Sequence, residues 1–399
     1  MTQVENYTTN VDENMRDRLN IHPDMSLHGT EGPIDVAYPR YFYNTSEIGL
    51  NLAGDLDTGD PTGAMVIPSS MSPTNQTRSD ARTGYFDPAI SRSNLHVLTG
   101  QTVTRLILGL PSSLITGGNR RIIGVDFASG PSGINRTVAT NKEVILAAGA
   151  IQSPVLLQIS GIGPKKVLKS LNISVQIDLP GVGNNFQDHP MAQFPFECYA
   201  TQKRIVLDHL AREDVGAYEL LAASWGQISI AAQKPLSRGT VHPTSPSIFD
   251  GPLLDPRYCA DPFDCKIIRL GLRTVRRLMK SDAMRPLLPV VDTRFESDDY
   301  MELTAALKPL VGTEYHPSGT TSMMPEDMGG VVDAELMVYG TCNLRVIDAG
   351  IMPLIPGAHI QAAVYAVAEK AADIIKAAAS GPEVCPLGLL KWPIGQNTV

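Results

Sequence analysis

The sequence predicts a mixed α/β fold, and three stretches of the chain lead to that prediction. Strand-like segments follow one another from residue 94 and end in an apolar run, Val-Ile-Leu-Ala-Ala-Gly-Ala, at 144–150. A helical pattern comes directly after this run. Near the other end of the chain, the strand-like segment 343–350 is followed by a loop and a helical pattern over 359–376. Strands that alternate with helices are typical of α/β proteins.

The first 93 residues predict little regular structure. Residues 1–40 are polar and interrupted by Pro and Gly, and the first element that we expect in them is a turn followed by a strand, at 27–36. Residues 47–93 are rich in Asp, Gly, Ser and Pro. Because long irregular stretches in a compact protein are usually functional loops, we expect this part to cover a site.

Residues 94–190 predict a β-meander that feeds a parallel strand. Gly117-Gly118-Asn119 predicts a turn between two of its segments. The run at 144–150 is apolar throughout, which predicts a strand buried on both faces. The segments expected to form strands are 95–100, 102–110, 120–128 and 137–150.

Helices are expected after the meander and in the middle of the chain. Ser153 and Pro154 suit the N-cap and the first position of a helix, which predicts a helix over 153–160. Residues 191–310 are mixed in pattern, and 265–281 carries apolar side chains at helical spacing. We expect this middle portion to form a second layer that covers a cofactor and shapes a substrate pocket.

Composition and charge exclude several classes of function. The net charge of −8, without any basic run, argues against a nucleic acid or an anionic membrane as partner. No apolar run approaches the roughly 20 residues that span a bilayer, and no apolar core of a secretory signal opens the chain, which leaves localisation open. The cysteines are odd in number and lack Cys-x-x-Cys spacing, so we expect reduced thiols and no metal site. They are Cys198, Cys259, Cys265, Cys342 and Cys385.

Two histidines mark the part of the chain that suits chemistry. His316 lies in a His-Pro-Ser-Gly-Thr turn, and His359 lies at the start of the helix expected over 359–376. The positive end of a helix dipole attracts negative charge, such as that of a reduced flavin. The alternatives are a structural helix with a capping loop and a hydrogen-bonded turn residue at His316. Five other histidines are expected to be structural or at the surface: His22, His28, His189, His209 and His242.

Other catalytic motifs are absent from the sequence. Gly161-Ile162-Gly163 and Gly181-Val182-Gly183 do not complete the Gly-x-Gly-x-x-Gly loop that seats a dinucleotide pyrophosphate on a helix N-terminus. There is also no Gly-x-Ser-x-Gly nucleophile elbow and no His-Glu-x-x-His zinc motif.

Two passages resemble the glucose–methanol–choline (GMC) oxidoreductase family. The segment 149–163, GAIQSPVLLQISGIG, is similar to the second signature of that family at every constrained position. The segment that begins with HPSGTTSMMP and ends near residue 375 resembles the C-terminal catalytic segment of the family nearly throughout. Weaker matches extend the resemblance to most of 27–378, and the motifs resemble the fungal branch with aryl-alcohol oxidase-like and glucose oxidase-like enzymes. The weaker matches are HGTEGPIDV, RSDARTGYFDPAISRSNLHVLTGQTV, LPGVGNNFQDHP and PLSRGTV.

This resemblance implies a fold and a domain plan. It implies a partial FAD-binding, Rossmann-like domain interleaved with an antiparallel-sheet substrate domain. Residues 1–93 would form cover loops and part of both domains, and 94–190 a segment of the FAD-binding domain. Residues 191–310 would form a shortened substrate domain, and 311–380 the C-terminal FAD-binding and catalytic segment.

The resemblance also implies an activity, in which a small alcohol is oxidised with FAD as cofactor and oxygen or a quinone as final acceptor. His316 would be the general base that takes the hydroxyl proton while hydride leaves carbon for flavin N5, and His359 would hydrogen-bond the same hydroxyl. The fungal branch suggests a role in secondary metabolism. The positions that match cofactor-binding residues of the family are Val103, Asp348, Ala349, Ile360 and Gln361.

The sequence departs from the family pattern in two places. It lacks the strand, Gly-x-Gly-x-x-Gly loop and helix with which family members begin, and it is shorter than the family between about 216 and 226. We therefore expect weak FAD binding and an exposed apolar edge at 144–150. The alternative function is a truncated, non-catalytic remnant or an incomplete gene model, and a third possibility is that another chain supplies the nucleotide-binding half.

Overall fold

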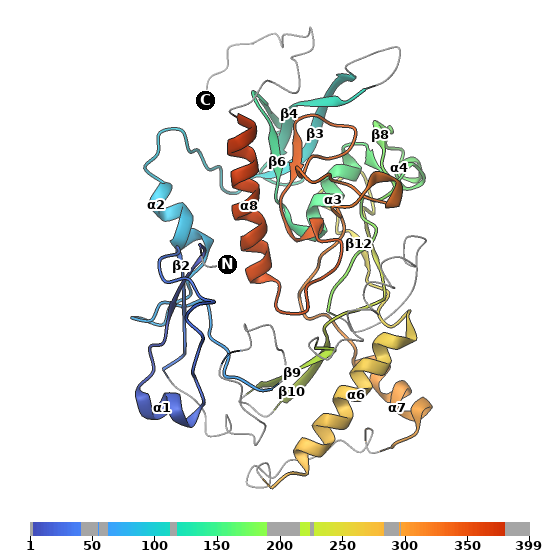
Figure 1. Ribbon diagram of the computed structural model, residues 1–399. Helices are drawn as coiled ribbons and strands as arrows, with labels where there is room; N and C mark the ends of the chain where they lie inside the picture. Colours follow the sequence, from blue (N-terminus) through green and yellow to red (C-terminus); the bar gives the residue numbers. More distant parts are fainter. Residues whose placement is uncertain are drawn as a thin grey trace.

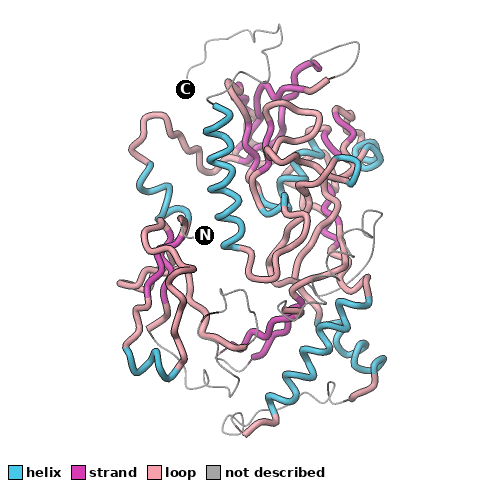
Figure 2. The backbone as a smooth tube through the Cα atoms, in the orientation of Figure 1, coloured by secondary structure: helices cyan, strands magenta, loops and turns pink. Residues whose placement is uncertain are grey.

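The computed structural model confirms the mixed α/β class (Figure 1). Helices, strands and long loops are interleaved along the part of the chain that is described (Figure 2). The described residues are 3–40, 55, 63–111, 118–189, 216–223, 227–282, 295 and 297–379. The domain bounds given above remain predictions.

The N-terminal segment contains regular structure that was not expected there. β1 (Glu5–Thr8) pairs in parallel with β2 (Ile34–Ala37), and α1 (Glu13–Arg18) lies between them in the chain. The prediction that no strand or helix precedes 27–36 is wrong, because β1 finds a partner strand 29 residues further along the chain. A small core then covers the pair, made by Tyr7, Leu19, Ile21 and Tyr38. Further along, η3 (Arg82–Phe86) and α2 (Asp87–Ala89) are short helices.

The meander is largely as predicted. β3 (Thr102–Pro111), β4 (Arg120–Ala128) and β5 (Arg136–Ala139) form an antiparallel sheet in that order. The segment 95–100 is not a strand, and its apolar side chains are exposed because no neighbouring strand pairs with it in the part of the chain that is described. Of the predicted Gly-Gly-Asn turn, Gly117 lies outside the described residues.

The parallel strand predicted at 144–150 is shorter and less buried than expected. β6 (Val144–Leu146) pairs in parallel with β13 (Leu344–Val346). Ile145 is 48% exposed, so burial on both faces is wrong and the expected apolar exposure near this strand is present.

α3 (Gly149–Ile159) begins four residues earlier than Ser153, and Pro154 lies inside it. A proline inside a helix cannot donate to the carbonyl four residues before it. Here that carbonyl, of Ala150, accepts a hydrogen bond of 2.6 Å from the Thr320 hydroxyl instead. Because the Thr320 hydroxyl replaces the missing N–H donor, the helix continues through Pro154. The same hydrogen bond joins the helix to the segment that contains His316.

The middle of the chain supplies a second core. The strands β9 (Tyr218–Ala223) and β10 (Gln227–Ala232) form an antiparallel pair at the place where the sequence is shortened, and α6 (Pro262–Met279) packs on them beside α7 (Tyr300–Leu307). Short elements precede and join them: β7 (Ile162–Gly163), α4 (Lys165–Ser170), β8 (Ile177–Asp178), β11 (Thr240–His242) and β12 (Leu253–Asp255).

A disulfide joins Cys259 to Cys265 at the start of α6. The prediction of reduced thiols is therefore wrong for these two residues, and also for Cys342, which is disulfide-bonded as well. Cys259 has a positive φ of 49°, and the turn that it makes brings its Cα to 5.4 Å from that of Cys265. The spacing of the cysteines in the sequence did not indicate that these two residues lie so close together.

The C-terminal unit follows the prediction closely. After the short helices η6 (Lys308–Leu310) and η7 (Glu326–Met328), β13 leads into η8 (Ala349–Ile351) and then α8 (Gln361–Ala379). α8 runs alongside the β3–β6 region in Figure 1, and Val367, Ala371 and Ile374 pack into the main core around α3. None of the described helices is long and apolar enough to cross a bilayer.

Candidate active site

Three segments that lie far apart in the sequence meet at the candidate site. Gln187 exchanges two backbone hydrogen bonds with Ser318, of 2.9 and 2.8 Å, so 181–189 and the His316 segment run side by side. The Gln187 amide also donates to the Pro353 carbonyl at 2.9 Å, which adds the loop that leads into α8. These bonds position the histidine carried by each segment.

Asp188 anchors the loop that precedes His316. Its carboxylate accepts the backbone N–H of His316 at 2.9 Å and the hydroxyl of Tyr258 at 2.7 Å, and it also accepts the Thr313 hydroxyl. Asp188 is 5% exposed, so these bonds lie in a region of low dielectric, where they are strong. The loop is therefore fixed directly beside the ring of His316.

The structure brings the two predicted histidines together. The ring centroids of His316 and His359 lie 5.0 Å apart, with an angle of 79° between the ring planes. His359 is half exposed, and its Nε2 lies 3.2 Å from Oε1 of Glu219, on β9. One imidazole is thus inside the protein and the other is at the rim of the site.

A third histidine, His189, contacts His316 from the other side. The two Nδ1 atoms are 2.9 Å apart, and His189 Nε2 lies 2.8 Å from the Pro356 carbonyl oxygen. A carbonyl only accepts, so Nε2 of His189 carries the hydrogen. His189 is fully buried, which lowers its pKa to about 4 and keeps the ring neutral. Its Nδ1 therefore accepts, Nδ1 of His316 donates, and Nε2 of a neutral His316 is left with a free lone pair.

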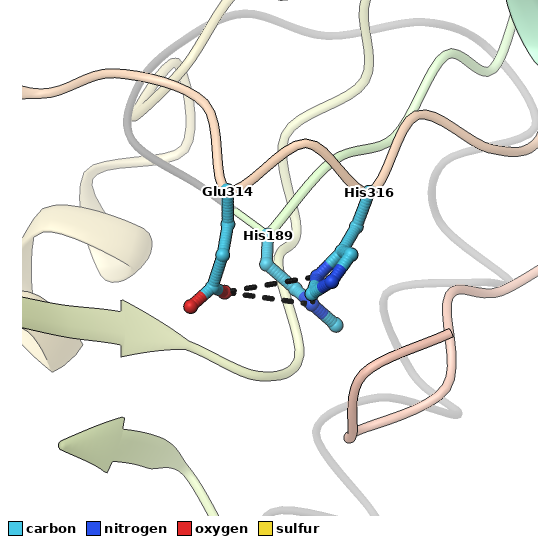
Figure 3. A group of neighbouring side chains, drawn as sticks. All are labelled: His189, Glu314 and His316. Atoms are coloured by element: carbon cyan, nitrogen blue, oxygen red, sulfur yellow. Dashed lines mark hydrogen bonds and ion pairs between the residues drawn. The ribbon is translucent and has the colours of Figure 1, made fainter. Parts of the chain in front are cut away.

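The carboxylate of Glu314 faces both of these rings (Figure 3). Its Oε2 is 3.7 Å from Nδ1 of His189 and 3.8 Å from Nδ1 of His316. That oxygen is buried and has no hydrogen-bond partner among the described residues. Burial raises the pKa of Glu314 to about 7. Ligand atoms of these three residues lie within 4.8 Å of one another, close enough to hold a metal ion, and the expectation of no metal site stays a prediction.

The two predicted catalytic histidines have opposite electrostatic environments. Burial, followed by the charge of His359, lowers the pKa of His316. The hydrogen bond to Glu219 is the main cause that raises the pKa of His359. Paired groups whose pKa values are pushed apart are typical of sites where one group accepts a proton and the other donates a hydrogen bond.

Asp348 and Ala349 hold together the segments that form the site. The buried Asp348 carboxylate accepts hydrogen bonds from Gly149 N–H at 3.0 Å, from the Ser153 hydroxyl at 2.6 Å and from Gly350 N–H at 2.7 Å. The Ala349 carbonyl accepts the backbone N–H of Gly319, from the His316 segment, at 3.2 Å. Both residues thus join β13 and α3 to the histidine segment, and the Asp348 side chain is already occupied.

The remaining predicted positions are divided between two regions. Ile360 is buried at the start of α8, and Gln361, the first residue of that helix, is exposed and accepts a hydrogen bond from Ser70 at 3.2 Å. Val103 is 36% exposed and lies on β3, opposite Phe127 of β4, in a sheet that includes none of the histidine segments.

Sequence reasoning missed the residues around the two histidines, which are His189, Glu314, Asp188 and Glu219. His189 had been assigned to a structural or surface role, although it lies in the Gln-Asp-His-Pro passage that weakly resembles the family. That passage was the one signal that pointed toward it. The only signal in the sequence that pointed to Glu314 was its position, two residues before His316.

Comparison with known proteins decides the family. Residues 42–191 and 235–368 match the two family models that describe GMC oxidoreductases. The GMC oxidoreductase family protein Mala s 12 of Malassezia sympodialis is 34% identical over 442 aligned positions, which cover 91% of this chain and 70% of that protein. The chain belongs to the GMC oxidoreductase family.

Solved structures of similar proteins agree in fold. An FAD-dependent oxidoreductase from Chaetomium thermophilum superposes with a TM-score of 0.81 at 27% identity, covering 95% of this chain and 79% of that one. A fungal aryl-alcohol oxidase superposes with a TM-score of 0.80 at 24% identity, over 95% of this chain and 78% of that one, and supports the fold alone. The GMC resemblance and its fungal branch are thus confirmed, and so is FAD as the cofactor.

The residues present fit the flavin end of FAD. α8 begins beside the His316–His359 pair, its first turn carries no acidic residue, and Gly357 and Ala358 just before it are small and exposed. A helix N-terminus of this kind suits the negative charge of a reduced flavin. For the pyrophosphate, the sequence contains no Gly-x-Gly-x-x-Gly loop.

Proposed function

We propose that this GMC oxidoreductase oxidises the CH–OH group of a small alcohol, with Nε2 of His316 as the base. The observation that carries the proposal is the hydrogen-bond chain from the Pro356 carbonyl through His189 to His316. This series of hydrogen bonds fixes the tautomer of His316, so the ring nitrogen that is left without a proton is Nε2. A base must be neutral and correctly oriented before the substrate arrives, and these hydrogen bonds provide both conditions.

His359 would hold the hydroxyl that His316 deprotonates. Its Nε2 is engaged with Glu219, which leaves Nδ1 of the half-exposed ring for a substrate oxygen. Two imidazoles whose planes meet at 79°, with centroids 5.0 Å apart, suit one hydroxyl that accepts from one ring and donates to the other. The transfer would move one proton from the alcohol oxygen to His316 Nε2.

Bound FAD supplies the hydride acceptor for the alcohol carbon. Ile360 and Gln361, at the start of α8, would hold the flavin ring, Asp348 and Ala349 would lie along the chain to the pyrophosphate, and Val103 would contact the adenine. Oxygen or a quinone would reoxidise the cofactor. The resemblance to the fungal branch of the family suggests a role in fungal secondary metabolism.

A second candidate is a non-catalytic member of the family. The observation in its favour is the missing pyrophosphate loop, since a helix N-terminus and several N–H donors would be lost from a dianionic group. The two candidates differ in whether this chain retains FAD.

The test begins with titration of the purified full chain with FAD, followed by anaerobic mixing with aromatic and aliphatic primary alcohols. We expect an alcohol of this class to bleach the visible absorbance of bound FAD. His316→Ala should slow the bleaching by about 10²–10⁴-fold, whereas His22→Ala, at an exposed histidine outside the site, should not. FAD binding without reduction by any of these alcohols would refute the proposal, and failure to bind FAD would favour the non-catalytic candidate.

A further inference from the structure

We propose that His189, Glu314 and His316 form a binding site for one divalent transition-metal ion of the Zn²⁺ type. The three side chains come from two segments that are paired in the fold, and Figure 3 shows the Glu314 carboxylate directed toward both rings. The site is independent of FAD and of the alcohol, because all its ligand atoms belong to this chain.

The spacing of the ligand atoms suits a small metal ion. Zn²⁺ binds imidazole nitrogen at about 2.0–2.1 Å and carboxylate oxygen at about 2.0–2.2 Å, mostly in tetrahedral geometry, which sets neighbouring ligand atoms roughly 3.3 Å apart. The three distances are 2.9 Å between the Nδ1 atoms and 3.7 and 3.8 Å from these atoms to Oε2 of Glu314. They lie on both sides of the required value, so shifts of less than 1 Å would complete the site.

The donor set is prepared for coordination. Nδ1 of His189 already has a free lone pair, because the Nε2–H of that ring donates to the Pro356 carbonyl. Metal-ligating histidines almost always make such an outer hydrogen bond through their second nitrogen. Oε2 of Glu314 is buried without a hydrogen bond in the described structure, an arrangement that costs free energy until a cation or donor arrives.

His316 would have to change tautomer to join the site. Its Nδ1 now shares a hydrogen with His189, and an ion would replace that hydrogen. The displaced proton moves to Nε2, so the His316 ring stays neutral. Nε2 of His316 then carries a proton and no longer accepts one. Zn²⁺ should therefore inhibit alcohol oxidation, and this consequence alone rests on the proposed function.

The ligand types select the metal. Two imidazoles and one carboxylate favour Zn²⁺ and neighbouring transition metals, whereas Mg²⁺ prefers oxygen ligands and keeps its waters. Three protein ligands leave a fourth position open for water.

The experiment is isothermal titration of the full chain, treated with a chelator and free of FAD, with ZnCl₂ and separately with MgCl₂. We expect one Zn²⁺ per chain and no saturable heat from Mg²⁺. Glu314→Gln keeps the size of the side chain and removes the anionic ligand, and it should weaken Zn²⁺ by more than about 100-fold, since the loss of an outer-shell partner already costs 10–100-fold. His22→Asn, which removes an exposed histidine beside Asp17, should bind as the wild type does.

Absence of a saturable Zn²⁺ site, or equal affinity in Glu314→Gln, would overturn the proposal. Circular dichroism and thermal melting establish that the variant is folded. If Glu314→Gln does not fold, X-ray absorption of the Zn²⁺-loaded wild type decides the question. A first shell with two imidazoles supports the site, and a shell without them contradicts it. Because no step uses FAD or alcohol, a failure of the proposed function would leave this result unaffected.

Discussion

The hydrogen bond between Thr320 and Ala150 gives a quantitative test of how the site is attached to α3. Thr320 is fully buried, and its hydroxyl donates at 2.6 Å to the Ala150 carbonyl, which Pro154 leaves without its usual helical donor. Thr320→Val keeps the shape of the side chain and removes this donor. A buried carbonyl left unsatisfied costs about 1–3 kcal/mol, so we expect the free energy of unfolding to fall by that amount.

A matched control is available in Thr304, whose hydroxyl donates to the Tyr300 carbonyl at 2.7 Å on the more exposed α7. Thr304→Val should change the free energy of unfolding by less than about 0.5 kcal/mol, because water replaces the lost donor. The assay is urea unfolding followed by circular dichroism. Equal effects of the two substitutions would refute the reasoning.

The double variant Pro154→Ala, Thr320→Val sharpens the test. An alanine at 154 restores an N–H that can donate to Ala150, so the loss caused by Thr320→Val should shrink when Pro154 is also replaced. The expected interaction energy is about 1 kcal/mol, within the range seen for residues that share one hydrogen-bonded group. Additive effects of the two substitutions would show that the Thr320 hydroxyl does not compensate for the proline.

Three further predictions concern stability. Gly181→Ala would place a Cβ 2.1 Å from the Gly329 carbonyl oxygen and should cost at least about 1–3 kcal/mol in thermal or urea unfolding, whereas Gly251→Ala meets no atom within 4 Å and should stay within about 0.5 kcal/mol of wild type. Asp348→Asn replaces an oxygen acceptor by an amide donor against buried donors and should cost about 1–3 kcal/mol; a neutral result would contradict the role of Asp348 in joining β13 to α3. Burial lowers the pKa of His242, so protonation favours the unfolded chain, and stability should fall as the pH drops below about 6.5. His242→Gln should lose less stability than wild type between about pH 7 and pH 5 in urea unfolding, and an equal loss would refute this assignment.

Local patterns predicted the elements whose stability is local. The helix expected over 359–376 is present as α8, and the strands expected at 102–110 and 120–128 are β3 and β4, because apolar spacing and turn residues operate within a few residues. The segment 95–100 shows the limit of such patterns. It alternates like a strand, yet no strand forms there, since a strand also needs a partner.

The start of α3 depended on contacts that the sequence does not display. Ser153-Pro154 is a good signal for a helix start, but the extra turn before it is stabilised from distant segments. Asp348 accepts the Gly149 N–H, and Thr320 replaces the donor that Pro154 lacks. Each of these partners lies at least 170 residues away in the sequence.

Like the fold, the candidate site could be predicted from the sequence only where the signal is local. The His-Pro-Ser-Gly-Thr turn and the start of α8 gave His316 and His359, and the family resemblance gave their roles. The residues that tune them, His189 and Glu314, were not found, because the pairing of Gln187 with Ser318 that brings His189 to His316 is visible only in three dimensions. The roles of all these residues remain predictions.

The tautomer of His316 is the claim on which the proposed chemistry depends most directly. Nitrogen-15 NMR of the full chain with labelled histidine distinguishes a protonated from an unprotonated ring nitrogen, and His316→Gln assigns the signal. We predict a neutral His316 with the hydrogen on Nδ1 and a free lone pair on Nε2, and a loss of this preference in His189→Asn. A His316 ring that carries its hydrogen on Nε2 would contradict the proposal that this nitrogen accepts the proton of the alcohol.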